Sequence, residues 1–322
     1  MSGTTPKTGE IEGPDLGTFA AFGEFDESIE SAQAVGIDSG ATLVKICVRG
    51  RDGALYFATW PSPSKERVVE LLDKLAPDHV GVTGCGSVPI LAALNRQAMH
   101  PIEFDAWGRG ANEILAESGL GSDKPYLLIS IGTGTSALRV DGNLVERVGG
   151  TALGGGTALG LGLALTGCQS HDELVELATS GQRGSVDLLI SDIYETAEVP
   201  IAAEATAASF GKLARSLNRT SQDGSQSSQV PFPAAPPKRE DMAAAIMGLV
   251  AENIALISNA SATVAGVSRI VYGGSTLNEN PTIVHTVRVL TSVMGFEAIV
   301  LARSGHAGAL GAMLLCSPEK RS

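Results

Sequence analysis

Residues 34–60, AVGIDSGATLVKICVRGRDGALYFATW, decide the fold class of this chain. Three β-like runs follow one another closely here, at 34–38, 42–49 and 54–60, with turn residues between them. Residues 127–148 repeat the same order with the runs LLISI, TSALRVD and LVERV. Three tightly connected strands that occur twice predict two sheets built by duplication.

Helices and apolar strands alternate after each set of strands. The first set is followed by a helix at 64–76, the strand HVGVTG, a helix near 88–98, the strand-like IEFD at 102–105 and a helix to about 117. The second is followed by helices at 156–166, 171–180 and 240–265, the strand SRIVYGG, a helix at 280–294, the strand AIVLA and a helix at 306–315. This pattern predicts an α/β protein of two duplicated RNase H-like domains, as in actin-like ATPases and sugar kinases, with a nucleotide cleft between them.

The length of 322 residues fits two domains of about 150 residues each. We expect a first actin-like domain at 34–120 and a second at 121–322. Residues 1–33 are polar, acidic and rich in Gly and Pro, which predicts a disordered tail. Residues 217–239 are rich in Ser, Gln and Pro, which predicts an exposed loop inserted into the second domain.

Charge and hydropathy narrow the function classes. The net charge of −12 argues against nucleic acid as a partner, because no surplus of cations exists to neutralise phosphates. The N-terminus has no apolar signal core, and no apolar run reaches the ~20 residues that cross a bilayer. The four cysteines are far apart, which favours free thiols in a reducing compartment. We therefore expect a cytoplasmic protein with no membrane partner.

The first hairpin has the residues of a phosphate-binding turn. Gly40 and Thr42 lie in a tight turn whose amides and hydroxyl can hold phosphate oxygens. Lys45 on the next strand supplies a positive charge, and Asp38 can organise Mg²⁺ through water. The alternative is an ordinary β-hairpin with an exposed lysine. A second glycine turn, with Gly132, Thr133, Gly134 and Ser136, stands at the same place in the second repeat, and the match favours the phosphate-binding interpretation.

Two further glycine motifs are candidates for nucleotide binding. Gly154, Gly155, Gly156 and Thr157 precede an apolar helix, where free amides and the helix dipole attract anions; the alternative is a flexible connection. Gly273, Gly274 and Ser275 end a later strand, where a backbone without side chains can approach adenine; an ordinary strand-to-helix turn is an equal alternative.

Three charged residues are candidates for the acceptor side of a kinase. Transfer of phosphate to an alcohol needs a carboxylate near the hydroxyl, and Glu103 and Asp105 are the available pair. The pattern alone does not choose between them, since either could cap the next helix. Arg147 could hold a carboxylate in bidentate fashion, or it could pair with Glu146 at the surface.

The ordered motifs, taken together, resemble the type II pantothenate kinase family over residues 35 to 316. The motifs are DSGATLVK at 38–45, EFDA at 103–106, IGTGTS at 131–136, RVGGTALGGGT at 147–157, DIY at 192–194, AASFG at 207–211, VYGGS at 271–275 and GALGA at 308–312. The resemblance implies phosphorylation of pantothenate to 4′-phosphopantothenate by MgATP, the first step of coenzyme A synthesis. It also implies a homodimer, with coenzyme A or its acyl thioesters as candidate inhibitors.

The resemblance also implies roles for single residues. Glu103 matches the catalytic carboxylate and Arg147 the arginine that holds the substrate carboxylate. Thr133 and Ser136 match hydroxyl positions near substrate and phosphates, and Lys45 matches the phosphate-binding lysine.

One position departs from the family pattern. The family usually has two glycines in the first turn, and this chain has Gly40 followed by Ala41. We expect Ala41 to have negative φ and the turn to keep its shape. A kinase for another hydroxylated metabolite, such as an amino sugar, and a regulator that binds a nucleotide or coenzyme A without catalysis are the alternative functions.

Overall fold

The computed structural model describes residues 16–121, 124–194, 204–214 and 237–317. They belong to two compact units. The first unit comprises residues up to Leu128, Leu138–Glu146 and the residues from Val300 onward. The second unit comprises Ile129–Ala137 and Arg147–Ile299.

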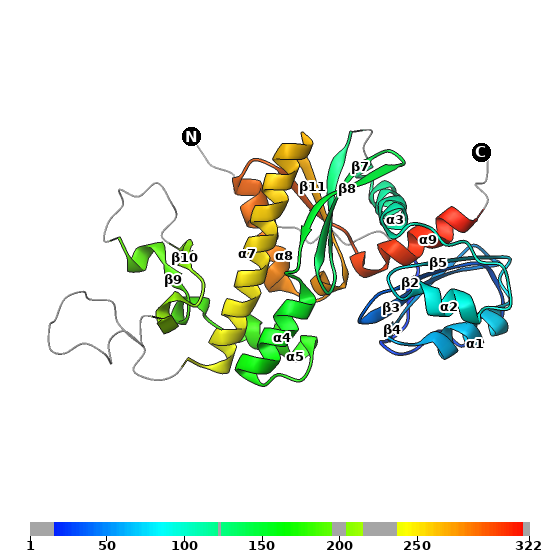
Figure 1. The fold of residues 1–322 in the computed structure, drawn as a ribbon, viewed down its shortest axis with the longest axis horizontal. Coiled ribbons are helices and arrows are strands. Elements are labelled where there is room, and N and C mark those ends of the chain that lie inside the picture. Colours follow the sequence, from blue (N-terminus) through cyan, green and yellow to red (C-terminus); the bar gives the residue numbers. More distant parts are fainter. Residues whose placement is uncertain (1–15, 122–123, 195–203, 215–236, 318–322) are drawn as a thin grey trace. The chain divides into compact units, whose positions relative to one another are not determined.

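The first unit is built on a five-stranded sheet in the order β1-β4-β3-β2-β5 (Figure 1). Its strands are β1 (Thr18–Phe19), β2 (Ala32–Ser39), β3 (Leu43–Gly50), β4 (Leu55–Pro61) and β5 (His79–Thr83). The central three strands form two consecutive antiparallel pairs, while β5 runs parallel to β2 and β1 runs parallel to β4. The sheet is therefore mixed, as the sequence predicts.

Helices cover both faces of this sheet. The helices are α1 (Lys65–Leu75), α2 (Ser87–Ala93), α3 (Glu103–Glu117) and α9 (Ala307–Cys316). On one face, Leu72 and Leu75 of α1 join a core with Ile46 and Trp60 of the sheet. On the other face, α9 packs on β2, β5 and α3, and close approach of the backbones requires residues without side chains at Gly36, Gly81, Gly110 and Gly311. Small residues thus allow α9 to complete the unit.

The second five-stranded sheet repeats the strand order of the first. It runs β12-β11-β6-β7-β8, with β6 (Tyr126–Ile131), β7 (Thr135–Asp141), β8 (Leu144–Thr151), β11 (Arg269–Gly273) and β12 (Glu297–Val300). When the strands of each repeat are numbered in chain order, both sheets contain them in the spatial order third, second, first, fourth. In the first unit an isolated parallel bridge between Gly81 and Met99 stands where β12 lies in the second. This shared order supports duplication of one architecture.

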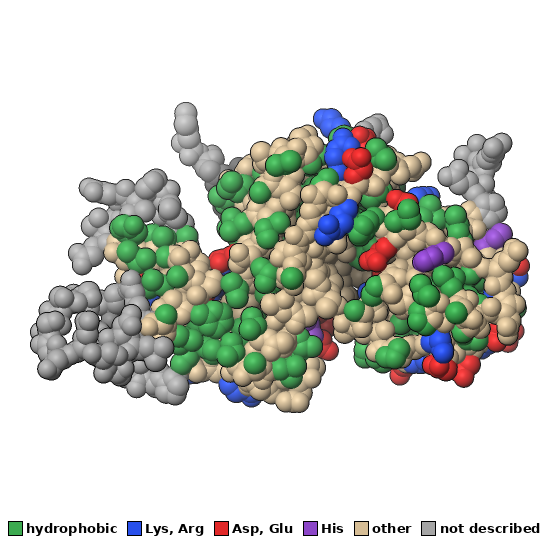
Figure 2. Space-filling view, viewed as in Figure 1, with side chains coloured by type: hydrophobic (Ala, Val, Ile, Leu, Met, Phe, Trp, Pro, Cys, Tyr) green, Lys and Arg blue, Asp and Glu red, His purple; other side chains and the backbone are tan. Residues whose placement is uncertain are grey.

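The helices of the second unit centre on α7. They are α4 (Gly155–Thr166), α5 (His171–Ser180), α7 (Arg239–Ala265) and α8 (Pro281–Val293), and a small pair of strands, β9 (Leu188–Leu189) and β10 (Thr206–Ala208), lies before α7 in sequence. By length and composition α7 could cross a membrane, but 67% of its most apolar 18-residue stretch is buried within the folded protein, as in a core helix. Figure 2 shows hydrophobic side chains gathered over the region of α4, α5 and α7.

The predicted fold class is confirmed, and three details differ. IEFD does not form a strand, because α3 already begins at Glu103. Residues 16–33 are not a disordered tail in the structure, since Leu16 and Ile29 are buried and β1 pairs with β4. The described residues from Val300 onward pack with the first unit, which differs from the predicted second domain at 121–322. Residues 1–15, and the predicted inserted loop except for its last residues, lie outside the described part of the chain.

Candidate active site

Asp38 and Lys45 form the charged centre of the first unit. They are directly opposite each other on β2 and β3, and the Lys45 Nζ lies 3.8 Å from the Asp38 Oδ2. Asp38 is only 3% exposed. Burial raises the pKa of Asp38, and the positive charge of Lys45 opposes this rise. The pair therefore places one buried anionic oxygen donor and one cation at the end of β2, as the sequence predicts.

Glu103 joins this centre from the start of α3. Ile102 is the extended residue before the helix, so Glu103 occupies the first helical position. Its side chain remains accessible to solvent, yet partial burial raises the pKa of its carboxyl group. The negative charge of Asp38 raises this pKa further, and Lys45 lowers it. A carboxyl group that is both accessible and easily protonated is suited to accept a proton from an alcohol.

Asp105, the second carboxylate that the sequence offered, has a different environment. It lies two residues further along α3 and lines a hollow of about 290 Å³ with Arg109, Asn143 and Val145. The charges of Asp38 and Lys45 act on the carboxyl group of Glu103. Glu103 therefore belongs to the Asp38–Lys45 centre, and Asp105 lines the separate hollow.

The turn between β2 and β3 has the backbone conformation that we expected. The Gly40 N–H donates to the Leu43 carbonyl oxygen at 2.9 Å, which leaves Ala41 and Thr42 at the exposed tip. Ala41 is not among the described non-glycine residues with positive φ, so the expectation of negative φ is confirmed. A Cβ at Gly40 would lie 3.3 Å from the Lys45 Nζ. Alanine at position 41 therefore adds no backbone strain to the turn.

Two residues near Asp38, Gly308 and Trp107, were not predicted as part of the site. A Cβ at Gly308 of α9 would lie 2.7 Å from the Asp38 Oδ2 and 2.9 Å from the Trp107 Nε1. Trp107 is one helical turn beyond Glu103 and is buried. The motif at 308–312 signalled Gly308 without giving its role, and the apolar face of α3 hid Trp107.

In the second unit the three predicted glycine motifs come together at the end of β6. The Gly132 carbonyl oxygen accepts hydrogen bonds from the Gly155 N–H at 2.8 Å and from the Thr276 hydroxyl at 3.0 Å. The Gly156 N–H donates to the Thr133 carbonyl oxygen at 3.0 Å. The turn after β6, the start of α4 and the turn after β11 are thus joined by hydrogen bonds.

These contacts correct the expectation that the amides before α4 are free. The amides of Gly155 and Gly156 are used by the hairpin, and a Cβ at Gly154 would lie 2.8 Å from the Gly132 carbonyl oxygen. Gly274, with φ of +118°, lies directly on the Ile131 carbonyl group. The glycines therefore permit close packing of these turns, which the sequence could not distinguish from anion binding.

The remaining predicted residues take several positions around this packing centre. Gly273 is buried in β11, Ser275 follows Gly274, and the Thr157 hydroxyl donates to the Ala152 carbonyl oxygen at 2.9 Å. Gly134 closes the hairpin, since the Gly132 N–H donates to its carbonyl oxygen at 2.9 Å, and Thr133 is exposed at the tip.

Arg147 and Ser136 come together beside Gly150. Arg147 lies on β8, as the predicted strand LVERV implies, and β8 continues to Thr151. A Cβ at Gly150 would lie 2.9 Å from the Arg147 Nη2 and 3.4 Å from the Ser136 Cα. Arg147 is exposed to solvent. An exposed guanidinium next to a serine can bind a carboxylate and a second polar group of one ligand.

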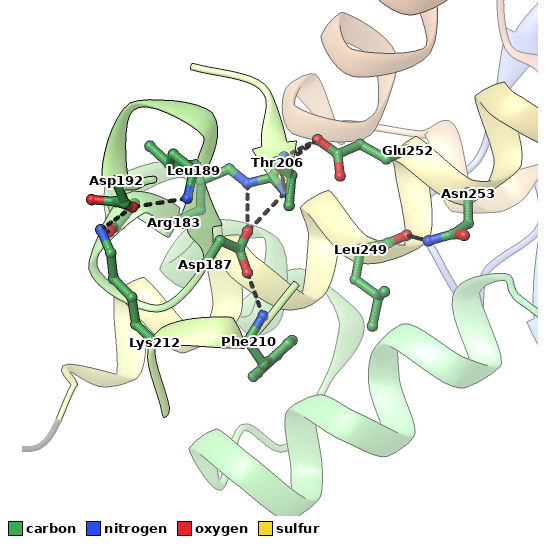
Figure 3. A network of polar contacts seen from close by, with 11 residues as sticks. Arg183, Asp187, Leu189, Asp192, Thr206, Phe210, Lys212, Leu249, Glu252 and Asn253 are labelled. Carbon is green, nitrogen blue, oxygen red and sulfur yellow. Dashed lines mark hydrogen bonds and ion pairs between the residues drawn. The ribbon is translucent and has the colours of Figure 1, made fainter. Parts of the chain in front are cut away.

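A separate polar network, drawn in Figure 3, fixes β9 and β10 against α7. Arg183 pairs with Asp187 and with Glu252 of α7, each at 2.8 Å, and also donates to the Thr206 hydroxyl at 2.9 Å. Gly248 lies beneath the guanidinium group of Arg183. The motifs DIY at 192–194 and AASFG at 207–211 lie partly in this region. A structural role therefore explains part of their sequence.

Comparisons with known proteins agree with this arrangement. A model of the Fumble family matches residues 111–315. The chain is 33% identical over 281 residues to a type II pantothenate kinase of Staphylococcus haemolyticus, covering 87% of this chain and 99% of the relative. A type II pantothenate kinase of Oceanobacillus iheyensis is 34% identical over 281 residues, with 87% and 98% covered. This chain belongs to the type II pantothenate kinase family.

Solved structures support the fold of this family member. One is the activator of the 2-hydroxyisocaproyl-CoA dehydratase from Clostridium difficile with bound ADPNP, with a TM-score of 0.53, 20% identity and 88% and 93% of the chains covered. Another is a ROK family glucokinase from Streptomyces griseus in complex with glucose and AMPPNP, with a TM-score of 0.51, 15% identity and 88% and 98% covered. Identities at this level show the fold alone.

Proposed function

We propose that this protein transfers the γ-phosphoryl group of ATP to the primary hydroxyl group of pantothenate, which yields 4′-phosphopantothenate for coenzyme A synthesis. The observation that carries this proposal is the assembly of Glu103, Asp38 and Lys45 in a chain of the type II pantothenate kinase family. The two alternative functions are a kinase for another hydroxylated metabolite and a regulator that binds a nucleotide or coenzyme A without catalysis. The test below distinguishes both from the proposal.

Glu103 is the group that acts on the acceptor hydroxyl. Its accessible carboxylate can accept the hydroxyl proton as the oxygen attacks the γ-phosphorus atom. Because its pKa is raised, it holds this proton more strongly than an ordinary glutamate does. Lys45 faces the same region and offsets the negative charge of the phosphoryl group during transfer.

The residues present fit a magnesium ion bound with ATP. Asp38 is a buried hard oxygen donor, which is the type of ligand that Mg²⁺ prefers. Within the described residues no group of three or more metal-binding side chains occurs, which suits an ion that keeps most of its water and phosphate ligands. When bound, Mg²⁺ neutralises phosphate charge. Asp38 would hold it through water.

Arg147 and Ser136 would bind the pantothenate carboxylate and a neighbouring polar group. The guanidinium of Arg147 offers two parallel donors to a carboxylate, and Ser136 lies beside the same glycine. Thr133, at the exposed tip of its hairpin, would contact a phosphate or the substrate. The Gly154–Gly156 and Gly273–Ser275 segments would act by holding this hairpin in shape.

Assembly, location and inhibition complete the proposal. A homodimer is supported by exposed apolar residues of α7, where Leu256 is 56% and Val264 89% exposed. A cytoplasmic location follows from the cysteine pattern and from the intracellular substrates, ATP and pantothenate. Coenzyme A and its acyl thioesters are proposed inhibitors, because they contain the pantothenate moiety.

A coupled ADP-release assay with purified full-length protein tests the function. Pantothenate should support turnover, whereas pantetheine and N-acetylhexosamines serve as a competing panel. Glu103→Ala should lower kcat by about 10²- to 10⁴-fold with ATP binding retained. Asp105→Ala, on the same helical turn, is the matched control and should stay near the wild-type rate.

Three results would contradict the proposal. Turnover of a hexosamine in preference to pantothenate would show a kinase of the same fold with another acceptor. Binding of ATP or coenzyme A without turnover of any acceptor would show a regulator. Equal rates for wild type and a folded Glu103→Ala variant would remove Glu103 from the catalytic role.

A further inference from the structure

The turn between β5 and α2, residues 83–87, lies directly against Asp38. In the parallel pairing of β2 with β5, Asp38 is in register with Thr83. Gly84 follows with φ of +90°, and a Cβ there would lie 2.5 Å from the Ser39 carbonyl oxygen and 2.7 Å from the Asp38 Oδ1. The Gly86 N–H donates to the Ser39 carbonyl oxygen at 2.8 Å. One side of the turn therefore fixes the end of β2.

The other side of the same turn holds the segment that leads into Glu103. The Thr83 hydroxyl, which is fully buried, donates to the Pro101 carbonyl oxygen at 3.0 Å. The Ser87 hydroxyl lies 2.9 Å from the His100 Nε2. Just before these contacts, the Val82 N–H donates to the Met99 carbonyl oxygen at 2.9 Å. Only Ile102 separates this anchored segment from Glu103, the first residue of α3.

We propose that the turn 83–87 is a positioning element that sets the separation of the Asp38 and Glu103 carboxylates, with Thr83 as its principal positioning residue. Thr83 is adjacent to Asp38 in the sheet and hydrogen-bonded two residues before Glu103. This inference rests on the proposed function, because it assigns Glu103 the proton transfer. The residues of the turn affect the reaction indirectly, by fixing the positions of Asp38 and Glu103.

The chemistry depends on this separation in two ways. A carboxylate displaced by about 1 Å from its reactive geometry can lose about 10²-fold in rate. The proton affinity of Glu103 also depends on its distance from the two charged groups that act on it, Asp38 of β2 and Lys45 of β3.

Thr83→Val tests the inference, because it keeps the shape of the side chain and removes the hydroxyl bond to Pro101. We expect kcat to fall about 10- to 100-fold while the KM for ATP changes less than about twofold. Thr83→Ser restores a hydroxyl and should recover most of kcat. The matched control is Thr166→Val in α4, which removes another buried threonine hydroxyl, bonded to the Gly162 carbonyl oxygen at 2.8 Å. It should lower Tm without lowering kcat.

His100→Ala provides a second variant where Thr83→Val does not fold, since His100 is exposed and its loss removes only the contact to Ser87. We expect a smaller fall in kcat, about three- to tenfold. The inference is wrong if the wild type is active and a folded Thr83→Val variant has an unchanged kcat. If Thr83→Val does not fold, an unchanged kcat in His100→Ala overturns the inference in the same way. An inactive wild type overturns the proposed function itself, so the two failures are distinguished.

Discussion

The turn after β2 and the turn after β6 occupy the same position in the strand order of their sheets, but their surroundings differ. The first is flanked by a charged pair, Asp38 before it and Lys45 after it, and its tip is exposed. The second has no charged residue between Ile131 and Ser136, and its carbonyl groups accept hydrogen bonds from α4 and from Thr276. The two turns therefore share a place in the strand order but differ in side-chain chemistry.

This difference indicates a division of labour. In the proposed function, the residues that flank the first turn supply charge for phosphoryl transfer, so substitutions there should change rates more than stability. The second turn is joined to two neighbouring segments, so substitutions there should change stability first. The following predictions test this division, from the largest expected effect to the smallest.

Lys45→Met should produce the largest effect among the four substitutions that follow. The variant keeps the apolar stem and removes the charge opposite Asp38, so kcat/KM should fall about 10²- to 10³-fold, with Tm nearly unchanged. Steady-state kinetics with varied ATP and a thermal melt measure both quantities. Lys65→Met, which removes a surface lysine paired with Glu66, is the control. A large loss of Tm with normal kinetics would reverse the assignment of the first turn.

Gly274→Ala should destabilise the second unit. The residue has φ of +118° and lies on the Ile131 carbonyl group, so a side chain adds strain and a collision. We expect a loss of about 2–4 kcal/mol, seen as a Tm lower by about 5–10 °C. Gly160→Ala in α4, where a Cβ meets nothing within 4 Å, should be neutral or stabilising. Equal melting curves for the two variants would show that the second turn is loosely packed.

Arg147→Ala should act on substrate binding with little effect on the fold. Arg147 is exposed on β8, so Tm should stay the same, while the KM for pantothenate rises about 10- to 100-fold. Arg139→Ala, which removes an arginine paired with Asp141 on β7, is the control. A KM effect confined to ATP would assign Arg147 to the nucleotide.

Ala41→Gly should have the smallest effect. Because the φ of Ala41 is not positive, glycine relieves no strain and only adds freedom to the turn. We expect kcat/KM to change less than about tenfold, or ~1.4 kcal/mol. If the wild type is inactive and the glycine variant turns over pantothenate, the natural protein is a regulator.

Sequence patterns predicted the succession of strands along the chain and most helix positions, because period-two runs and apolar helices are local signals. They also predicted Asp38 and Lys45 as neighbours in one hairpin, but they left Glu103 and Asp105 as alternatives, and only the resemblance to the type II pantothenate kinases chose Glu103. They did not distinguish glycines that bind anions from glycines that permit packing, since both need a missing side chain at the same kind of turn. Gly155 and Gly156 show this: their amides donate to Gly132 and Thr133, partners about twenty residues away in sequence, and no local pattern encodes that pairing.

The position of α9 in the first unit has a consequence for how the chain is made. Residues 307–316 cover β2, β5 and α3, but the whole second unit precedes them in the sequence. A ribosome therefore releases the Asp38 and Glu103 segments long before the helix that packs against Asp38 exists. Most of the second unit can begin to fold during that interval, whereas the first unit reaches its final form only after α9 emerges. The charged centre is thus completed only after the second unit has been synthesised.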